Sequence, residues 1–236
     1  MQRRDAALEM LGIERWRQRG ATPAESVSPA AQAGATNATA ARVDADSWDR
    51  LAAEVAACTA CALHATRTQT VFGVGDRNAE WLVIGEAPGA DEDRQGEPFV
   101  GRAGGLLNAM LRGIGLRREQ VYIANVLKSR PPNNRDPRPE EVASCLPFLL
   151  RQIALLRPRI ILVVGRIAAQ NLLATDTPIG RLRGQLLHFG AERTPLVVTY
   201  HPAYLLRSPG EKRKAWEDLK LARRVHSALP PRADAT

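Results

Sequence analysis

The fold is decided by the stretch Trp81-Leu-Val-Ile-Gly-Glu-Ala-Pro-Gly-Ala-Asp-Glu-Asp93. Its short apolar run ends at Gly85, which predicts a strand buried on both faces, as in a parallel sheet. The acidic loop after it leaves at the carboxyl end of the strand, where open α/β sheets bind their ligands. Because any buried strand followed by a Gly/Pro turn has this pattern, the rest of the chain must decide whether the loop is functional.

Further apolar runs alternate with helical segments along the chain. The predicted strands are 81–85, 121–126, 159–165 and 195–201, with a short strand at 185–189 and an edge strand or loop near 71–75. The predicted helices are 101–114, 139–156, 166–173 and 212–228. This alternation predicts an α/β fold, a three-layer α/β/α sandwich with a central, mostly parallel four-stranded sheet.

The chain divides into three parts by composition. Residues 1–20 contain an amphipathic helix, and residues 21–46 are rich in Ala, Thr, Ser, Pro and Gly, which is typical of a flexible linker. The compact domain is expected over residues 47–236. The N-terminal helix is expected either to pack on this domain or to dock a protein partner.

Composition limits the partners and the compartment. The 236 residues include 33 Lys and Arg against 25 Asp and Glu, a formal net charge of +8. Such a balance suits a polyanionic partner, and nucleic acid is the first candidate. The alternative is that the charge only keeps the protein soluble. Three cysteines and no secretory segment argue for a reducing compartment, and no apolar run has the length of a membrane span. We therefore expect a cytoplasmic protein.

Polar side chains follow three of the predicted strands. They are Glu86, Asn125 and His201, and the carboxyl ends of parallel strands should bring them to one edge of the sheet. The amide of Asn125 offers a donor and an acceptor, which can read the edge of a base. His201 can donate to an oxygen on which negative charge builds. Each residue type is also common in a purely structural role at a strand end.

Four separated motifs carry a resemblance to a known family. They are Gly85-Glu-Ala-Pro-Gly89, Gly96-Glu-Pro-Phe-Val-Gly-Arg-Ala-Gly104, Asn125 followed by Lys128-Ser-Arg-Pro-Pro-Asn-Asn-Arg-Asp-Pro137, and His201-Pro-Ala-Tyr-Leu-Leu-Arg207. In this order they resemble the iron–sulfur uracil-DNA glycosylases of family four, over about residues 48–225. The resemblance implies hydrolytic excision of uracil from DNA, which leaves an abasic site without strand cleavage.

The resemblance also implies roles for the residues of these motifs. Gly85 and Ala87 form a wall of the uracil pocket, Asn125 reads the base, and Phe99 stacks on it after it has been flipped out of the helix. In the family, one carboxylate faces the attacking water or the sugar, and Glu92 matches it. Ala87 stands where classical uracil glycosylases hold an aspartate.

The remaining site residues fall into a catalytic and a DNA-binding group. Glu86 lies near the base as a second carboxylate, and His201 donates to the uracil oxygen. Leu205 lies where an apolar wedge is expected, with Leu206 as the fallback. Lys128 and Arg207 are candidate phosphate contacts, and solvated surface charges are the alternative for both. The four residues of the DNA-binding group are therefore Lys128, Leu205, Leu206 and Arg207.

The cysteine pattern departs from that of the family. The family holds a [4Fe-4S] cluster with four cysteines, and this chain has Cys58, Cys61 and Cys145, with Ser129 at the fourth position. Serine is a much poorer ligand for iron than a thiolate. The resemblance nevertheless implies a [4Fe-4S] cluster, with Cys58, Cys61 and Cys145 as its ligands. The alternatives are a cluster with an oxygen group such as Ser129 as fourth ligand, a labile cluster, a three-iron cluster, or none.

Alternatives to uracil excision stay open at this point. The chain could excise another deaminated base, or it could be a DNA-binding or partner-docking member with little catalysis. A nucleotide-binding α/β protein is disfavoured, because no Gly-rich phosphate loop is present. The expected partner is uracil-containing DNA, with no membrane contact, and the protein is expected to act as a monomer.

Overall fold

The structure is a computed structural model that describes residues 47–231. The predicted N-terminal helix and linker fall in residues 1–46, outside the described residues. A helix over residues 47–56 opens the described part and buries Trp48, Leu51 and Val55. No helix among the described residues is both long enough and apolar enough to cross a bilayer.

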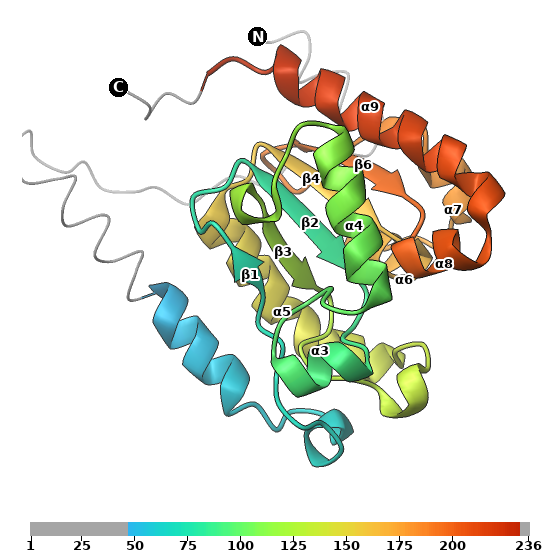
Figure 1. The fold of residues 1–236 in the computed structure, drawn as a ribbon. Coiled ribbons are helices and arrows are strands. Elements are labelled where there is room, and N and C mark those ends of the chain that lie inside the picture. The colour runs from blue at the N-terminus through green and yellow to red at the C-terminus, as the bar shows by residue number, and fades with distance from the viewer. Residues whose placement is uncertain (1–46, 232–236) are drawn as a thin grey trace, which may run out of the picture. The chain divides into compact units, whose positions relative to one another are not determined.

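The centre of the domain is one six-stranded sheet (Figure 1). Its strands are β1 (Val74–Gly75), β2 (Trp81–Gly85), β3 (Tyr122–Asn125), β4 (Ile160–Val164), β5 (Leu186–Phe189) and β6 (Thr194–Thr199). Their order is β1-β3-β2-β4-β6-β5. The four central strands are parallel, as predicted, and the short edge strands β1 and β5 pair antiparallel with β3 and β6.

Helices cover both faces of the sheet, which confirms the predicted three-layer architecture. The α-helices with labels are α3 (Ala90–Gln95), α4 (Arg102–Gly113), α5 (Pro139–Leu156), α6 (Arg166–Leu173), α7 (Ile179–Leu182), α8 (Pro202–Arg207) and α9 (Lys212–Ala228). One apolar core joins the sheet to α5, α6 and the helix over residues 47–56. The other joins the opposite face to α4, α8 and α9. Alternate strand residues feed the two cores, as the two-residue period of a strand requires.

The acidic loop is more ordered than the sequence indicates. Four of its positions form part of the short helix α3, which the sequence pattern did not predict. Asp93 is 3% exposed, and both of its carboxylate oxygens accept from the Thr68 N–H at 3.0 Å. A buried carboxylate that accepts hydrogen bonds fixes the residues beside it. The loop after β2 therefore has a fixed conformation.

Candidate functional site

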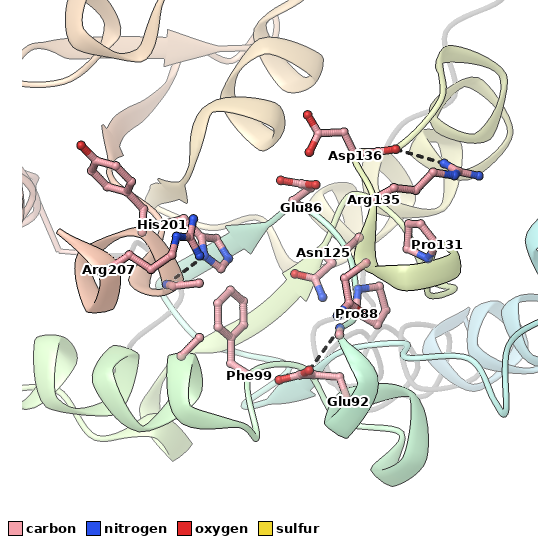
Figure 2. Close-up of a pocket in the computed structure, with 16 residues that line it drawn as sticks. Glu86, Pro88, Glu92, Phe99, Asn125, Pro131, Arg135, Asp136, His201 and Arg207 are labelled. Atoms are coloured by element: carbon pink, nitrogen blue, oxygen red, sulfur yellow. Dashed lines mark hydrogen bonds between the residues drawn. The ribbon is translucent and has the colours of Figure 1, made fainter.

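A cavity of about 400 Å³ lies at the carboxyl ends of the central strands. Gly85 and Asn125 are register partners in the parallel pair β2–β3, so the two strands end side by side. Figure 2 shows the side chains of Glu86, Phe99, Asn125 and His201 around one space. Of the site residues predicted from the sequence, those that line the cavity are Glu86, Ala87, Glu92, Phe99, Asn125, His201 and Arg207.

Asn125 presents an unpaired acceptor to this cavity. The residue is 2% exposed, and its Oδ1 is buried without a hydrogen-bond partner among the described residues. A Cβ on Gly85 would lie 2.3 Å from this Oδ1 and 2.6 Å from Cζ of Phe99. Only a glycine leaves room for the amide and the ring in these positions. Because a buried acceptor without a partner is costly, its position indicates a ligand that donates to it.

Phe99 is held in an unusual backbone conformation. Its φ of +56° lies in the left-handed region, which is uncommon for a bulky residue and concentrates at functional sites. A Cβ on Gly104 would lie 1.8 Å from the Phe99 carbonyl oxygen, so the first turn of α4 contacts this backbone directly. The ring lies 5.6 Å from the His201 ring, at an interplanar angle of 31°. The ring is thus set by its backbone as one side of the cavity.

His201 is a neutral donor with a defined tautomer. It precedes α8, and its Nδ1 accepts from the Ala203 N–H at 3.1 Å. The proton of the neutral ring must then be on Nε2. Burial, and then the positive charge of Arg207, lower the pKa of His201 to about 4. The side chain therefore offers one N–H donor at neutral pH and carries no charge.

Glu92 joins two walls of the cavity. Its Oε2 accepts from the Gly89 N–H at 3.1 Å, and its Oε1 accepts from the N–H groups of Val100 and Gly101 at 3.0 and 3.2 Å. The carboxylate thereby ties the start of α3 to the loop that carries Phe99 (Figure 2). Both of its oxygens are engaged by the backbone. Its geometry is that of an anchor for the cavity wall.

Glu86 has a different environment from Glu92. Burial raises the pKa of Glu86 to about 7, and the negative charge of Asp136 adds to this, whereas Arg166 acts in the opposite sense. Asp136 is itself paired with Arg166, with Nη2 3.0 Å from Oδ2. A carboxyl group with a pKa near the working pH, in a cleft, is typical of acid–base or water-orienting residues.

Two predictions for DNA contacts are wrong. Lys128 is 2% exposed and its Nζ donates to the Asn125 carbonyl, so it cannot reach a phosphate. Leu205 is 1% exposed and packs in the core beneath α8, because it lies on the inward side of that short helix. Leu206, the fallback wedge, is 36% exposed. Arg207 lines the cavity, and its contact with phosphate stays a prediction.

The cysteines lie outside the lining of the cavity, with Cys145 beside the backbone of Lys128. Cys145 on α5 is buried and its Sγ accepts from the Lys128 N–H at 3.1 Å. Burial raises the pKa of Cys145, and Cys61 and Cys58 lie close enough to raise it further. Ser129 is buried, and its hydroxyl accepts from Arg67 Nη1 at 3.0 Å. Between residues 47 and 231, no three Cys, His, Asp or Glu side chains converge into a metal site.

The loop between β3 and α5 was not predicted to line the cavity. Pro131, Asn134, Arg135 and Asp136 all contribute to it. The carboxylate of Glu141 fixes this loop, because Oε2 accepts from Arg135 Nη1 at 2.9 Å and from the Arg138 N–H at 2.8 Å. The prolines predicted an extended loop and nothing more. The run of Pro and Asn directly after a strand end was the available signal.

Comparisons with known proteins agree with this geometry. The model of the uracil DNA glycosylase superfamily matches residues 72–220. A type-4 uracil-DNA glycosylase of Archaeoglobus fulgidus is 48% identical over 181 residues, 74% of this chain and 91% of the relative. One of Thermotoga maritima is 44% identical over 170 residues, 70% of this chain and 88% of the relative. A type-5 enzyme of Pyrobaculum aerophilum is 31% identical over 148 residues, 56% of this chain and 64% of the relative. The chain therefore belongs to the uracil-DNA glycosylase superfamily and, within it, to the type-4 enzymes.

Proposed function

We propose that this protein removes uracil from DNA by hydrolysis of the N-glycosyl bond, and that Asn125 reads the base. The observation that carries the assignment is the buried, unpaired Oδ1 of Asn125 beside Phe99. The N3–H of uracil is a donor that suits this acceptor, and the amide NH₂ can donate to a carbonyl oxygen of the base. Cytosine has no hydrogen on N3, so it would leave Oδ1 unpaired. A site built on such a bond rejects analogues that lack the donor.

The base must leave the DNA stack before it can enter this cavity. Unstacking costs a few kcal/mol, and stacking on the Phe99 ring returns part of that cost. We assign Leu206, exposed at the end of α8, to the gap that the base leaves, and Arg207, which lines the cavity, to the DNA backbone. The net charge of +8 favours DNA over neutral partners.

The chemistry follows from the charges that develop as the bond breaks. The departing base becomes an anion, and the Nε2–H of His201 donates to its oxygen without first needing a proton from solvent. The sugar gains oxocarbenium character, which a carboxylate stabilises while it orients the attacking water. We assign this role to Glu86, because both oxygens of Glu92 are already held by the backbone.

Uracil-containing oligonucleotides test the function directly. The protein is incubated with single- and double-stranded oligonucleotides that hold one uracil, and abasic sites are cleaved with alkali. Fragments of the expected length support the assignment, and matched cytosine substrates should stay intact. Absence of fragments from the wild-type protein would refute the proposed activity. Product from cytosine at a similar rate would refute the reading role of Asn125.

The excision rate should depend on pH through Glu86. Its pKa is raised to about 7, so the carboxylate forms, and the rate rises, as pH increases through about 7. His201, with a pKa near 4, should add no second change above about pH 5. Single-turnover rates over about pH 5 to 9 measure this. Glu86→Gln should lower the rate about 100-fold and remove the dependence, whereas a profile unchanged by Glu86→Gln would contradict the assignment.

We also propose that Cys58, Cys61 and Cys145 hold an iron–sulfur cluster. The three thiols lie near one another, and the N–H bond to Cys145 Sγ suits a thiolate. The donor set departs from a four-thiolate cluster, since the fourth position is a hydroxyl held by Arg67. None of the three cysteines lines the cavity. No step of the proposed chemistry passes through the cluster.

Ser129→Cys should change the metal content. A fourth thiolate completes the usual ligand set, so anaerobically purified Ser129→Cys should hold more iron and sulfide per chain than the wild type. Iron and sulfide analysis with electron paramagnetic resonance measures this, and Ser129→Ala serves as the control. Equal iron in all three proteins would mean that position 129 does not contact the cluster. Iron-free wild-type protein would rule out the three-cysteine cluster.

A further inference from the structure

We propose that Lys128 and Gln152 are positioning residues that hold Asn125 in its base-reading conformation. The inference rests on the proposed excision of uracil and adds two buried residues to it. Lys128 Nζ lies 2.8 Å from the Asn125 carbonyl oxygen and 2.6 Å from Gln152 Oε1. The ammonium thus bridges the end of β3 to the middle of α5, behind the cavity.

The position of this ammonium is unusual for a lysine. Lys128 is 2% exposed, and lysine is almost never fully buried unless paired. Burial lowers the pKa of Lys128 to about 7. The two oxygen acceptors offset the cost of burying the side chain, because its N–H groups donate to them whether or not it is charged. In a protein that binds DNA, a lysine in this motif would be most useful at the surface. Its burial indicates a role inside the fold.

Asn125 lies where the strand pairing ends. Past this residue the Val126 and Leu127 N–H groups donate to the Gly85 and Glu86 carbonyls at 2.9 and 3.0 Å. These bonds hold the following residues against the loop after β2. Lys128 turns back three residues to donate to the Asn125 carbonyl itself. The backbone around Asn125 is therefore held by the loop after β2 and by the Lys128 side chain.

Gln152 holds the other end of the bridge. It is 0% exposed, and its Nε2 donates to the Phe72 carbonyl at 2.9 Å and lies 3.3 Å from the Tyr122 hydroxyl. With both of its amide atoms engaged, Gln152 has a single orientation, and so has the Lys128 ammonium. Positioning groups must themselves be held by neighbours for a site to stay in its productive geometry. Asn125 needs this, because its amide must lie where only the missing side chain of Gly85 leaves room, with Oδ1 2.3 Å from the position that a Cβ would take.

The test is a double-mutant cycle on single-turnover excision of uracil. Lys128→Met should lower the rate about 10- to 100-fold in the wild-type background, the value of a hydrogen bond to a charged group. In the Asn125→Ala background, where no reading amide remains to be placed, it should change the rate less than about twofold. A general loss of folding would lower both rates by the same factor. Tyr122→Phe, which removes a hydroxyl from the same network but leaves both Lys128 bonds, is the matched control.

If Lys128→Met is insoluble, a second pair of variants tests the positioning role through Gln152. Gln152→Leu removes one acceptor of Lys128 and should lower the rate about tenfold, whereas Gln152→Glu keeps an acceptor there and should recover most of it. Equal rates for these two variants, or an equal cost of Lys128→Met in both backgrounds, would overturn this inference alone. Absence of product from the wild type would instead overturn the proposed function, and this inference with it.

Discussion

Asn125→Ala is expected to lower kcat/KM for uracil in DNA by about 10³-fold. The variant loses the acceptor for N3–H and a donor to a carbonyl oxygen of the base, and it leaves these polar groups of uracil unpaired in a buried site. Removal of one donor to a developing anion alone typically costs 10²- to 10³-fold. Steady-state excision from a uracil-containing oligonucleotide measures the effect. The fold should persist, because the bond from Lys128 goes to the main chain of Asn125.

The control for this variant is the binding of undamaged DNA. Asn125 lies inside the cavity, so affinity for an oligonucleotide without uracil should change less than about twofold, as expected for contacts that carry no sequence information. Leu206→Ala should instead affect the handling of the DNA duplex, since Leu206 is exposed and does not line the base pocket. It should lower excision from double-stranded DNA more than from single strands. An Asn125→Ala enzyme with full activity would show that another group reads the base.

Gly85→Ala should lower kcat/KM for uracil in DNA by about 10²- to 10³-fold, nearly as much as Asn125→Ala. The added methyl carbon would lie 2.3 Å from Asn125 Oδ1 and 2.6 Å from Cζ of Phe99, well inside contact distance. One of the two side chains must then move, and a displacement of about 1 Å in a site can cost 10²-fold. The mutation adds a methyl and removes no interaction. A loss of activity would thus test the geometry of the pocket rather than its chemistry.

Gly105→Ala provides the comparison for this substitution. A Cβ at Gly105 on α4 meets nothing within 4 Å, and alanine favours a helix interior over glycine by about 1 kcal/mol. Gly105→Ala should retain full excision and raise the free energy of unfolding, measured by urea denaturation with fluorescence detection. Full activity in Gly85→Ala would mean that the cavity adapts, and would contradict the tight packing around Asn125.

The sequence was informative about the centre of the sheet and less so about its loops. Long apolar runs such as Ile160–Val164 can only be buried strands, so the four parallel strands and both helical layers could be predicted. Helix α3 could not be predicted, because its six residues include three acids and show no apolar periodicity. The carboxylate of Glu92 stabilises it through a local cap on the Gly89 N–H, and the buried Asp93 stabilises it through a tertiary contact with Thr68.

The same distinction holds for the site. Asn125, His201 and Glu86 could be placed at one sheet edge because each follows a parallel strand. The direction of a side chain on a short helix could not be predicted in this way, and Leu205, the expected wedge, is buried whereas Leu206 is exposed. Burial of Lys128 was also beyond reach, because its two acceptors lie on different elements of the fold. Motif spacing gives neighbours along the chain, and only packing decides which of them face solvent.

The helix over residues 47–56 has a consequence for how metal would enter the protein. Trp48, Leu51 and Val55 anchor it by buried apolar contacts, and Cys58 and Cys61 follow at its end. In a zinc finger the metal itself supplies the free energy that orders its ligands. Here buried apolar side chains also hold the segment that leads to the two cysteines. If a cluster is bound as proposed, loss of its iron should therefore leave the helix over residues 47–56 packed on the domain.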